Sequence, residues 1–180
     1  MRIVAGEWRG RKLIAPDGDA TRPTADRTRE TLFSMLASRL GSFEGLKIAD
    51  LFAGSGALGL EGLSRGAEHC LFADQDAAAV RAIRANIANV RAQSRCEVRA
   101  SSVMSLGPAK EPMDLLLLDP PYNTGAGVVA IEKLNRLGWI APSSWISLET
   151  AKDESVSIKG FEAETGRDVG RARLHLLRLI

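Results

Sequence analysis

The sequence is poor in the residues that build metal sites and disulfide frameworks. Its 180 residues include two cysteines and two histidines. Cys70 and Cys96 have neither a CxxC spacing nor a histidine cluster nearby, so we expect no zinc site, no other metal and no disulfide framework, with both thiols buried. His69 and His175 lie in or beside predicted strands without a partner at ligand spacing, and we expect both to be structural.

Long apolar segments are also absent. No run approaches the roughly 18 residues that span a membrane, and the first eight residues lack the apolar stretch of a secretion signal. We therefore expect a cytoplasmic protein. The sequence holds no internal repeat, and a hydrophobic content of 45% over 180 residues suffices for one core, so we expect a single domain with at most a small appendage. No exposed apolar stripe demands a partner, and we expect a monomer.

Charge is distributed unevenly, although the net charge is only +2. Residues 1–29 carry seven Lys and Arg against four Asp and Glu, and residues 165–180 carry four against one, whereas the segment between them carries 13 against 17. Both ends are basic and the middle is acidic. Such asymmetry is more often a solvated surface than a nucleic-acid footprint, so it needs a second observation before it indicates RNA or DNA.

From residue 46 onwards, patterns typical of strands alternate with patterns typical of helices. The predicted strands cover residues 46–52, 70–73, 97–100, 115–118 and 145–148. The predicted helices cover residues 57–64, 77–91 and 128–137. Two final strands, 157–165 and 171–179, are joined by the turn-rich residues 166–170 and are expected to form an antiparallel hairpin at the sheet edge. The alternation predicts an α/β fold with a mainly parallel sheet.

The first 45 residues have a different character. Residues 3–15 predict a short hairpin with Gly10 in its turn. The hairpin tip combines an aromatic residue with three cations, a set that suits RNA: Trp8, Arg9, Arg11 and Lys12. A helix should follow, capped by Thr24 or Asp26, running to about Leu40 and stopped by Gly41.

Three arginines lie at or near the start of this helix, where its dipole disfavours positive charge: Arg22, Arg27 and Arg29. A bound phosphate or carboxylate would offset that cost. Ion pairs with Asp26 and Glu30 explain the arrangement equally well.

A glycine loop follows the first predicted strand. Residues 50–59 read Asp-Leu-Phe-Ala-Gly-Ser-Gly-Ala-Leu-Gly, a GxGxxG pattern between a strand and a helix, where the backbone can approach a ligand closely. NAD and S-adenosylmethionine enzymes both use such a turn, and it also occurs without a ligand. Asp50 favours S-adenosylmethionine, because a carboxylate there would repel a pyrophosphate and attract an ammonium group.

Carboxylates and small residues after the next two strands extend this candidate cofactor site. Asp74 lies about 20 residues beyond the loop, where a carboxylate can bind ribose hydroxyls. Asp76 is a second candidate for that role, but it is also explained as a helix cap. Ser102 and Val103 could edge an adenine pocket. The predicted cofactor contacts are Asp50, Phe52, Ala53, Gly54, Gly56, Asp74, Gln75, Ser102 and Val103.

The most apolar run of the chain ends in a second short pattern. Residues 113–118 predict a buried central strand, and Asp119-Pro120-Pro121-Tyr122 follows at its carboxyl end, the edge where open α/β sheets bind ligands. The two prolines donate no N–H, so the carbonyl groups of Asp119 and Pro120 are predicted to be free acceptors beside a carboxylate and an aromatic face. Acceptors without donors suit an amino group as substrate.

DxFxGxG followed by DPPY resembles the paired motifs of class I S-adenosylmethionine-dependent methyltransferases that act on amino groups of nucleobases. Residues 2–13, 22–33 and 52–61 are also similar to the bacterial family that methylates guanine N2 in small-subunit (16S) ribosomal RNA, and the similarity spans nearly the whole chain. The resemblance implies a Rossmann-like sheet of order 3-2-1-4-5-7-6 with strand seven antiparallel. It implies an RNA-contacting extension over 1–45 before a methyltransferase domain over 46–180, with 16S RNA or an assembly intermediate as partner.

These patterns give a mechanistic hypothesis. Asp119 and the Pro120 carbonyl, held rigid by Pro121, should bind the amine hydrogens as positive charge develops on nitrogen, while Tyr122 stacks on a base that has left its helix. The predicted RNA contacts are Trp8, Arg9, Arg11, Lys12, Arg22, Thr24, Arg27 and Arg29. The alternatives are an N6-adenine or other amino-group methyltransferase on DNA or RNA, an NAD-dependent oxidoreductase, and a catalytically silent RNA-binding protein.

Overall fold

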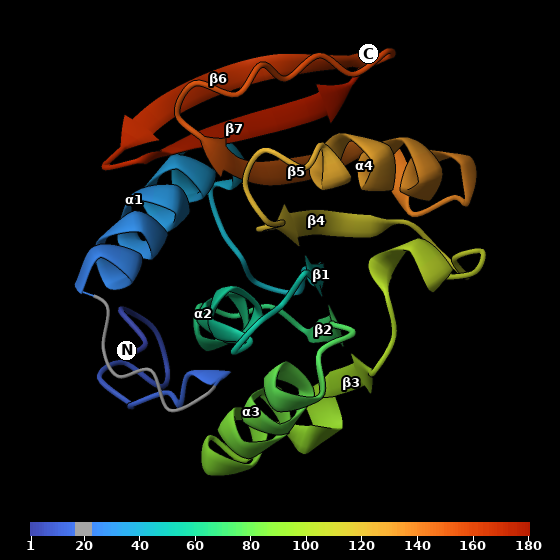
Figure 1. Cartoon of the computed structure of the whole chain (residues 1–180). Helices are drawn as coiled ribbons and strands as arrows, with labels where there is room; N and C mark the ends of the chain where they lie inside the picture. The colour runs from blue at the N-terminus through green and yellow to red at the C-terminus, as the bar shows by residue number, and fades with distance from the viewer. Residues whose placement is uncertain (17–22) are drawn as a thin grey trace.

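A seven-stranded sheet forms the centre of the computed structural model, which describes residues 1–16 and 23–180, apart from the side chains of Pro23 and Thr24 (Figure 1). The strands are β1 (Lys47–Leu51), β2 (His69–Ala73), β3 (Cys96–Arg99), β4 (Met113–Leu118), β5 (Ile140–Ala151), β6 (Phe161–Val169) and β7 (Ala172–Leu179). The helices are α1 (Pro23–Leu40), α2 (Ala57–Ser64), α3 (Ala77–Asn89) and α4 (Ala126–Arg136).

The order of the sheet is β3-β2-β1-β4-β5-β7-β6, as the family resemblance implied. All pairs from β3 to β5 are parallel, and β7 is antiparallel to both of its neighbours. Leu51 at the end of β1 pairs with Leu118 of β4, and Leu118 pairs with Leu148 of β5. The loops after β1 and β4 therefore leave the sheet at one edge, next to the end of β5.

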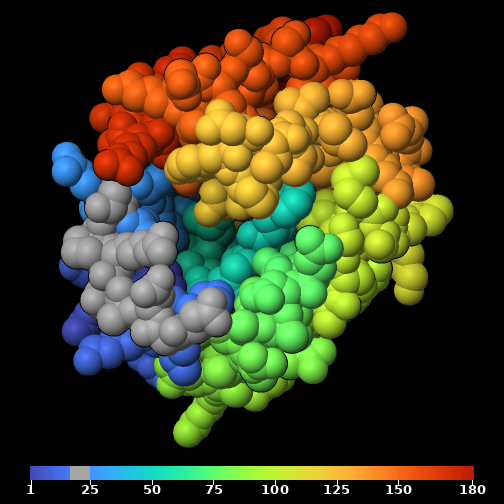
Figure 2. All heavy atoms as spheres, in the orientation of Figure 1, coloured from blue at the N-terminus to red at the C-terminus, as the bar shows by residue number. Residues whose placement is uncertain are grey.

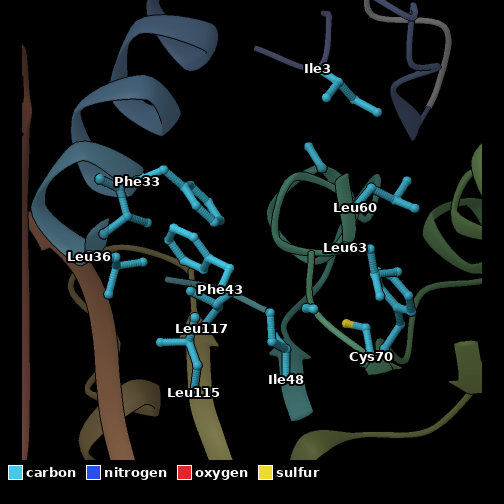
Figure 3. Packing of buried hydrophobic residues seen from close by; sticks show 14 of the residues in the cluster. Ile3, Phe33, Leu36, Phe43, Ile48, Leu60, Leu63, Cys70, Leu115 and Leu117 are labelled. Carbon is cyan, nitrogen blue, oxygen red and sulfur yellow. The ribbon is translucent and has the colours of Figure 1, made fainter. Parts of the chain in front are cut away.

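Apolar residues alternate between the two faces of the sheet. Leu115 and Leu117 of β4 pack into one core with α1 and α2, as Figure 3 shows for Phe33, Phe43 and Ile48 around them. Leu116 and Leu118 pack into a second core on the opposite face, which α4 covers. Because both faces of β4 are buried over residues 115–118, its sequence there is continuously apolar rather than alternating.

Several predicted bounds needed correction. Strand β5 begins at Ile140, earlier than predicted, because Met113 pairs with Ile140 before a bulge in β5 shifts the register. The predicted turn over 166–170 is mostly strand, since Gly166 to Val169 continue the ladder of β6 with β7 and only Gly170 and Arg171 remain between the strands. The predicted bounds of α2 are confirmed.

The amino-terminal predictions also changed. The segment of residues 1–13 reverses direction at Gly10, but it contains one isolated antiparallel bridge, Arg2 with Lys12, rather than two strands. Helix α1 begins at Pro23, so Thr24 and Asp26 lie inside its first turn and neither is its cap. Proline is favoured at the first helical position because its missing N–H would have no partner there.

Glu61 of α2 fastens this amino-terminal segment to the sheet domain. Its carboxylate is fully buried and accepts hydrogen bonds from the backbone N–H groups of Val4 at 2.9 Å and Ala5 at 3.1 Å. It also forms ion pairs with Arg29 of α1 at 3.2 Å and with Arg65 at 2.9 Å. One anion thus joins three parts of the chain, and Ile3, Trp8 and Leu13 share a core with α1 and α2.

The described residues contain neither a membrane-spanning helix nor a cluster of metal-ligating side chains. No helix in the described part of the chain has the length and apolarity needed to cross a bilayer. Within the same residues, no three His, Cys, Asp or Glu side chains gather as they would around a metal ion.

Replacing Glu61 with alanine should lower the free energy of unfolding by about 3 to 5 kcal/mol, because it leaves the buried guanidinium of Arg29 without its main counter-charge. Urea unfolding measures the change. Glu68→Gln, at an exposed carboxyl shortly after the same helix, is the matched control and should stay within about 0.5 kcal/mol of the unchanged protein. A loss of less than about 1 kcal/mol for Glu61→Ala would show that the contacts of this carboxylate do not stabilise the fold.

Candidate active site

A cavity of about 560 Å³ opens at the carboxyl edge of the parallel strands. Its lining includes Phe52, Ala53 and Gly54 of the glycine loop, together with Asp119 and Tyr122 after β4. Figure 2 shows the surface hollowed here, with residues of the glycine loop at the bottom and the segment after β4 above them. The two sequence patterns predicted to act together therefore face one cavity.

The wall opposite the glycine loop comes from outside the parallel part of the sheet. Helix α1 contributes Ala25, Thr28, Arg29 and Leu32, and residues 169–172 at the turn between β6 and β7 contribute the rest. Both elements stand side by side at the left of Figure 1. The cavity is thus bounded by the glycine loop on one side and by α1 and the β6–β7 turn on the other.

The backbone of the glycine loop is held in conformations that bring it close to a ligand. Gly54 has φ +59° and Gly56 has φ +81°, and a Cβ atom at Gly54 would meet no atom within 4 Å. Phe52 also has a positive φ of 58°, which is costly for a residue with a side chain. Such strain persists where the surrounding structure imposes it, and it is common at ligand sites.

The two candidates for a ribose contact, Asp74 and Asp76, have different hydrogen-bond partners, and these favour Asp74. Asp74 follows β2, and its carboxylate accepts hydrogen bonds from the N–H of Gly54 and from the N–H of Asp76, both at 2.9 Å. Asp76 caps α3 by accepting from the N–H of Ala79 at 3.1 Å. Asp74 is therefore next to the cavity and supports its glycine loop, whereas Asp76 has a structural role.

Asp50 does not line the cavity, and the contact predicted between its carboxylate and a ligand ammonium stays a prediction. Its side chain is 1% exposed and accepts a hydrogen bond from the N–H of Gly59 at 2.8 Å, which fastens the start of α2 to β1. Burial raises the pKa of Asp50 well above its usual value, and the charges of Asp119 and Asp74 raise it further, against the effect of the Gly59 bond. Asp50 therefore acts on the loop's backbone.

The remaining predicted contacts lie around the cavity rather than in its lining. Gly56 is the residue before α2, and Gln75 is exposed after β2. Ser102 accepts a hydrogen bond from the N–H of Met104 at 3.1 Å as the cap of a short 3₁₀ helix, η3 (Val103–Ser105), in which Val103 is buried. Pro120 and Pro121 line a small neighbouring hollow, and no hydrogen bond to the Pro120 carbonyl is found in the described part of the chain.

Glu149 is a site residue that the sequence reasoning missed. It lies on β5 directly after Leu148, the partner of Leu118, so it stands beside Asp119 on the neighbouring strand. It lines the same cavity and accepts a hydrogen bond from the hydroxyl of Tyr122 at 2.8 Å. The signal was available, because Glu149 is the first residue after the predicted fifth strand, whose carboxyl end had to lie at the same edge.

The carboxyl groups of Asp119 and Glu149 are close enough to perturb each other. Burial within the protein is the largest cause that raises the pKa of Asp119, to about 8, although the residue still reaches solvent at the cavity. Repulsion from Glu149 and a hydrogen bond to it raise the pKa further. Burial and Glu149 also raise the pKa of Tyr122, so its hydroxyl stays protonated and donates a hydrogen bond to Glu149. The pKa of Asp119 thus responds to its burial and to the neighbouring carboxyl of Glu149.

Two of the predicted RNA contacts have buried side chains with partners inside the protein, although Arg29 also lines the cavity. Trp8 is 8% exposed and lies under the guanidinium of Arg95, 5.3 Å from the ring centre. Arg29 is 3% exposed and pairs with Glu61 and Asp26, so the explanation by ion pairs holds, with Glu61 as a partner in place of Glu30. Both side chains thus have interaction partners within the protein.

The other predicted RNA contacts keep a surface position or lie outside the described residues. Arg22 belongs to residues 17–22, and the side chain of Thr24 is also outside the described part. Arg9, Lys12 and Arg27 are exposed. Arg11 is exposed too, but its guanidinium donates to the carbonyl of Asn89 at the end of α3.

Comparison with known proteins agrees with this geometry. The model of a family described as conserved hypothetical protein 95 matches residues 1–178. Ribosomal RNA small subunit methyltransferase D of Escherichia coli K12 is 39% identical over 150 residues, which cover 83% of this chain and 74% of that protein. The same-named protein of Haemophilus influenzae is 36% identical over 159 residues, which cover 86% of this chain and 80% of that protein.

Solved structures share the fold. The structure of the Escherichia coli protein yhhF has a TM-score of 0.85 at 34% identity, covering 99% of this chain and 97% of that one. Magnesium protoporphyrin IX methyltransferase from Synechocystis, solved with bound S-adenosylmethionine, has a TM-score of 0.67 over 91% of this chain and 87% of its own. At 15% identity, the second comparison concerns the fold alone.

Glu149→Gln should lower the pKa of Asp119 from about 8 towards its usual value, because it removes a neighbouring negative charge and leaves a group of equal size. Burial remains, so the pKa should stay above that of an exposed aspartate. The carboxyl carbon shift of Asp119, followed by NMR against pH, measures the change. Glu132→Gln, at an exposed position of α4, should leave the titration unmoved; an equal pKa in Glu149→Gln and the unchanged protein would contradict the coupling.

Proposed function

The chain belongs to the protein family described as conserved hypothetical protein 95, and on that premise we propose that it transfers a methyl group from S-adenosylmethionine to the exocyclic N2 amine of a guanine in small-subunit (16S) ribosomal RNA. The observation that carries the proposal is the shared cavity of Gly54 and Asp119. Relatives named ribosomal RNA small subunit methyltransferase D support the class of reaction and of RNA. The proposal carries with it the cytoplasmic location predicted from the sequence.

The residues of the glycine loop fit S-adenosylmethionine. Gly54 offers open backbone at the cavity, and the carboxylate of Asp74, held beside it by the 2.9 Å bond to its N–H, has lone pairs left for ribose hydroxyls. The amino end of α2, at Ala57 and Leu58, also borders the cavity and favours a carboxylate. A volume of about 560 Å³ is within the range of cofactor sites.

The residues after β4 fit the amine. When bound, S-adenosylmethionine supplies a methyl group on a positively charged sulfur, which a nitrogen lone pair can attack. The lone pair of a guanine amine is delocalised into the ring, so the nitrogen must rehybridise before it attacks. The new nitrogen–carbon bond forms as the carbon–sulfur bond breaks, and one of the two amine protons must leave. Asp119 and the Pro120 carbonyl stabilise this change because they hold the amine hydrogens more strongly as charge develops.

Tyr122 positions the base. Its ring is 41% exposed at the cavity rim, and its hydroxyl is fixed by Glu149 at 2.8 Å, so one aromatic face is available for stacking in a defined orientation. The target base must be unpaired or leave its helix to reach this face, since the amine is inaccessible within a stack. Loops of structured ribosomal RNA, free or in an assembling subunit, meet this requirement.

The amino-terminal segment supplies the RNA-binding surface in this proposal. Arg9 and Lys12 are exposed at its turn and form no ion pair among the described residues. Hydrogen bonds from Glu7 N–H to the Ser64 carbonyl at 2.7 Å and from Trp8 N–H to the Ser64 hydroxyl at 2.9 Å hold this turn against α2. Fixed cations on this surface can bind phosphates of the RNA.

Methyl transfer to purified small-subunit RNA, followed by nucleoside analysis, tests the reaction. The expected product is N2-methylguanosine, and Asp119→Ala should reduce its rate by about 100-fold or more while S-adenosylmethionine still binds by calorimetry. Asp114→Ala, at the opposite end of the same strand, should keep the rate. Methyladenosine as the product would replace the guanine assignment by the adenine alternative, and an Asp119→Ala enzyme of full activity would refute the catalytic role.

RNA binding at different salt concentrations tests the surface. Replacing Arg9 and Lys12 together by alanine should lower the slope of log affinity against log salt by about 1 to 2, because two phosphate contacts are lost. The affinity for S-adenosylmethionine should not change. The control pair is Lys110→Ala with Lys159→Ala, both exposed near the opposite edge of the sheet. If both pairs of substitutions had equal effects, RNA would not recognise the amino-terminal turn.

A further inference from the structure

Glu149 stands at the cavity in a position that the reaction alone does not explain. Parallel strands lie about 4.8 Å apart, and Leu118 and Leu148 are paired, so the residues that follow them, Asp119 and Glu149, project beside one another. Both line the cavity. Methyl transfer to an amine needs acceptors at one nitrogen, which Asp119 and Pro120 already provide, and a second carboxyl therefore suggests a second hydrogen-bonding position on the substrate.

The two carboxyls are short of donors within the protein. Tyr122 donates to one oxygen of Glu149, and Asp119 interacts with Glu149 itself, but no other N–H or O–H of the described residues donates to either side chain. No cation of that part of the chain pairs with them. Two adjacent acids without a counter-ion destabilise the empty site, and such arrangements are typical of functional positions. The open cavity leaves room for a ligand to supply further donors to both carboxyls.

The edges of the four RNA bases differ in what they offer such a pair. Guanine presents two adjacent donors, N1–H and the N2 amine. Adenine presents its N6 amine beside an unprotonated N1, and cytosine presents its N4 amine beside an unprotonated N3. Uracil has one N–H between two carbonyl groups. Only guanine can place an amine hydrogen on one carboxylate and a ring N–H on its neighbour.

We infer that Glu149 accepts the N1–H of the target guanine while Asp119 holds the N2 amine, so that Glu149 determines the base specificity of the site. The inference rests on the proposed function. It adds Glu149 to the residues that bind the base and gives a physical reason why the base is guanine. Tyr122 fixes one oxygen of Glu149 at 2.8 Å and leaves the carboxylate oriented for the base stacked on its ring. Adenine or cytosine would set a ring nitrogen lone pair against the carboxylate of Glu149. Neither the ring nitrogen nor the carboxylate would then have a hydrogen-bond donor.

A base analogue separates this role from a structural one. 2-Aminopurine keeps the reacting amine of guanine but has an unprotonated N1. Small-subunit RNA is assembled by ligation with guanine or 2-aminopurine at the position that the unchanged enzyme methylates, and the rates of methyl transfer are compared at one pH. The ratio of the two rates cancels any effect of a substitution on Asp119, because both substrates use the same amine chemistry.

The unchanged enzyme should prefer guanine by about 10⁴-fold, and Glu149→Gln should reduce this preference to about tenfold or less, because the glutamine amide can donate to an unprotonated N1. Binding of S-adenosylmethionine and the midpoint of thermal unfolding show that the variant is folded. Glu132→Gln is the matched control and should keep the full preference. Glu149→Ala, which removes the acceptor, should also lower the preference and serves if the glutamine variant does not fold, whereas Glu149→Asp, which keeps the charge on a shorter side chain, should keep the preference at a lower rate.

Failure of the proposed function and failure of the role of Glu149 give different results. If the unchanged enzyme methylates no guanine, the proposed function falls and this inference falls with it. If guanine is methylated normally and Glu149→Gln retains the full preference over 2-aminopurine, the inference is overturned while the proposed function stands. If neither the glutamine variant nor the alanine variant discriminates less than the unchanged enzyme, Glu149 has no part in reading the base.

Discussion

Parallel pairing in register is the constraint on which the candidate site depends. Leu51, Leu118 and Leu148 are neighbours across three strands, so the loops that follow β1 and β4 leave the sheet at one level, beside Glu149 of β5. The strands are fixed by two cores, one on each face, rather than by the loops themselves. The glycine loop, the Asp119 loop and Glu149 can therefore hold unfavourable features, a positive φ at Phe52 and two adjacent acids, without disturbing the fold.

Local patterns predicted the sheet domain well and the amino-terminal contacts poorly. The bounds of α2 followed from glycines on both sides of it, and β4 followed from a run that is apolar at every position because both of its faces are buried. Trp8 was misjudged because its partner Arg95 lies far away in the sequence, and no local spacing reports such a contact. Glu149 was missed because it belongs to no motif, although topology placed it beside Asp119.

The amino-terminal segment behaves as part of the sheet domain's core rather than as an attached arm. Gly6 lies so close to α2 that a Cβ atom there would be 1.9 Å from the Ser64 carbonyl oxygen, and Ile3 is 1% exposed. Asn86 of α3 extends the connection, since its amide donates to the carbonyl groups of Ile14 and Ser55 at 2.9 Å each. One asparagine thus links the amino-terminal segment, α3 and the glycine loop, and movement of any one of them affects the others.

The buried carboxylate of Glu61 also fixes an order of events during synthesis. Val4 and Ala5 leave the ribosome before Glu61, whose side chain binds their N–H groups and follows 57 and 56 residues later. These two residues therefore cannot make their native contacts until α2 can pack on β1 and β2. A segment that is synthesised before α2 thus reaches its place only after α2 has formed.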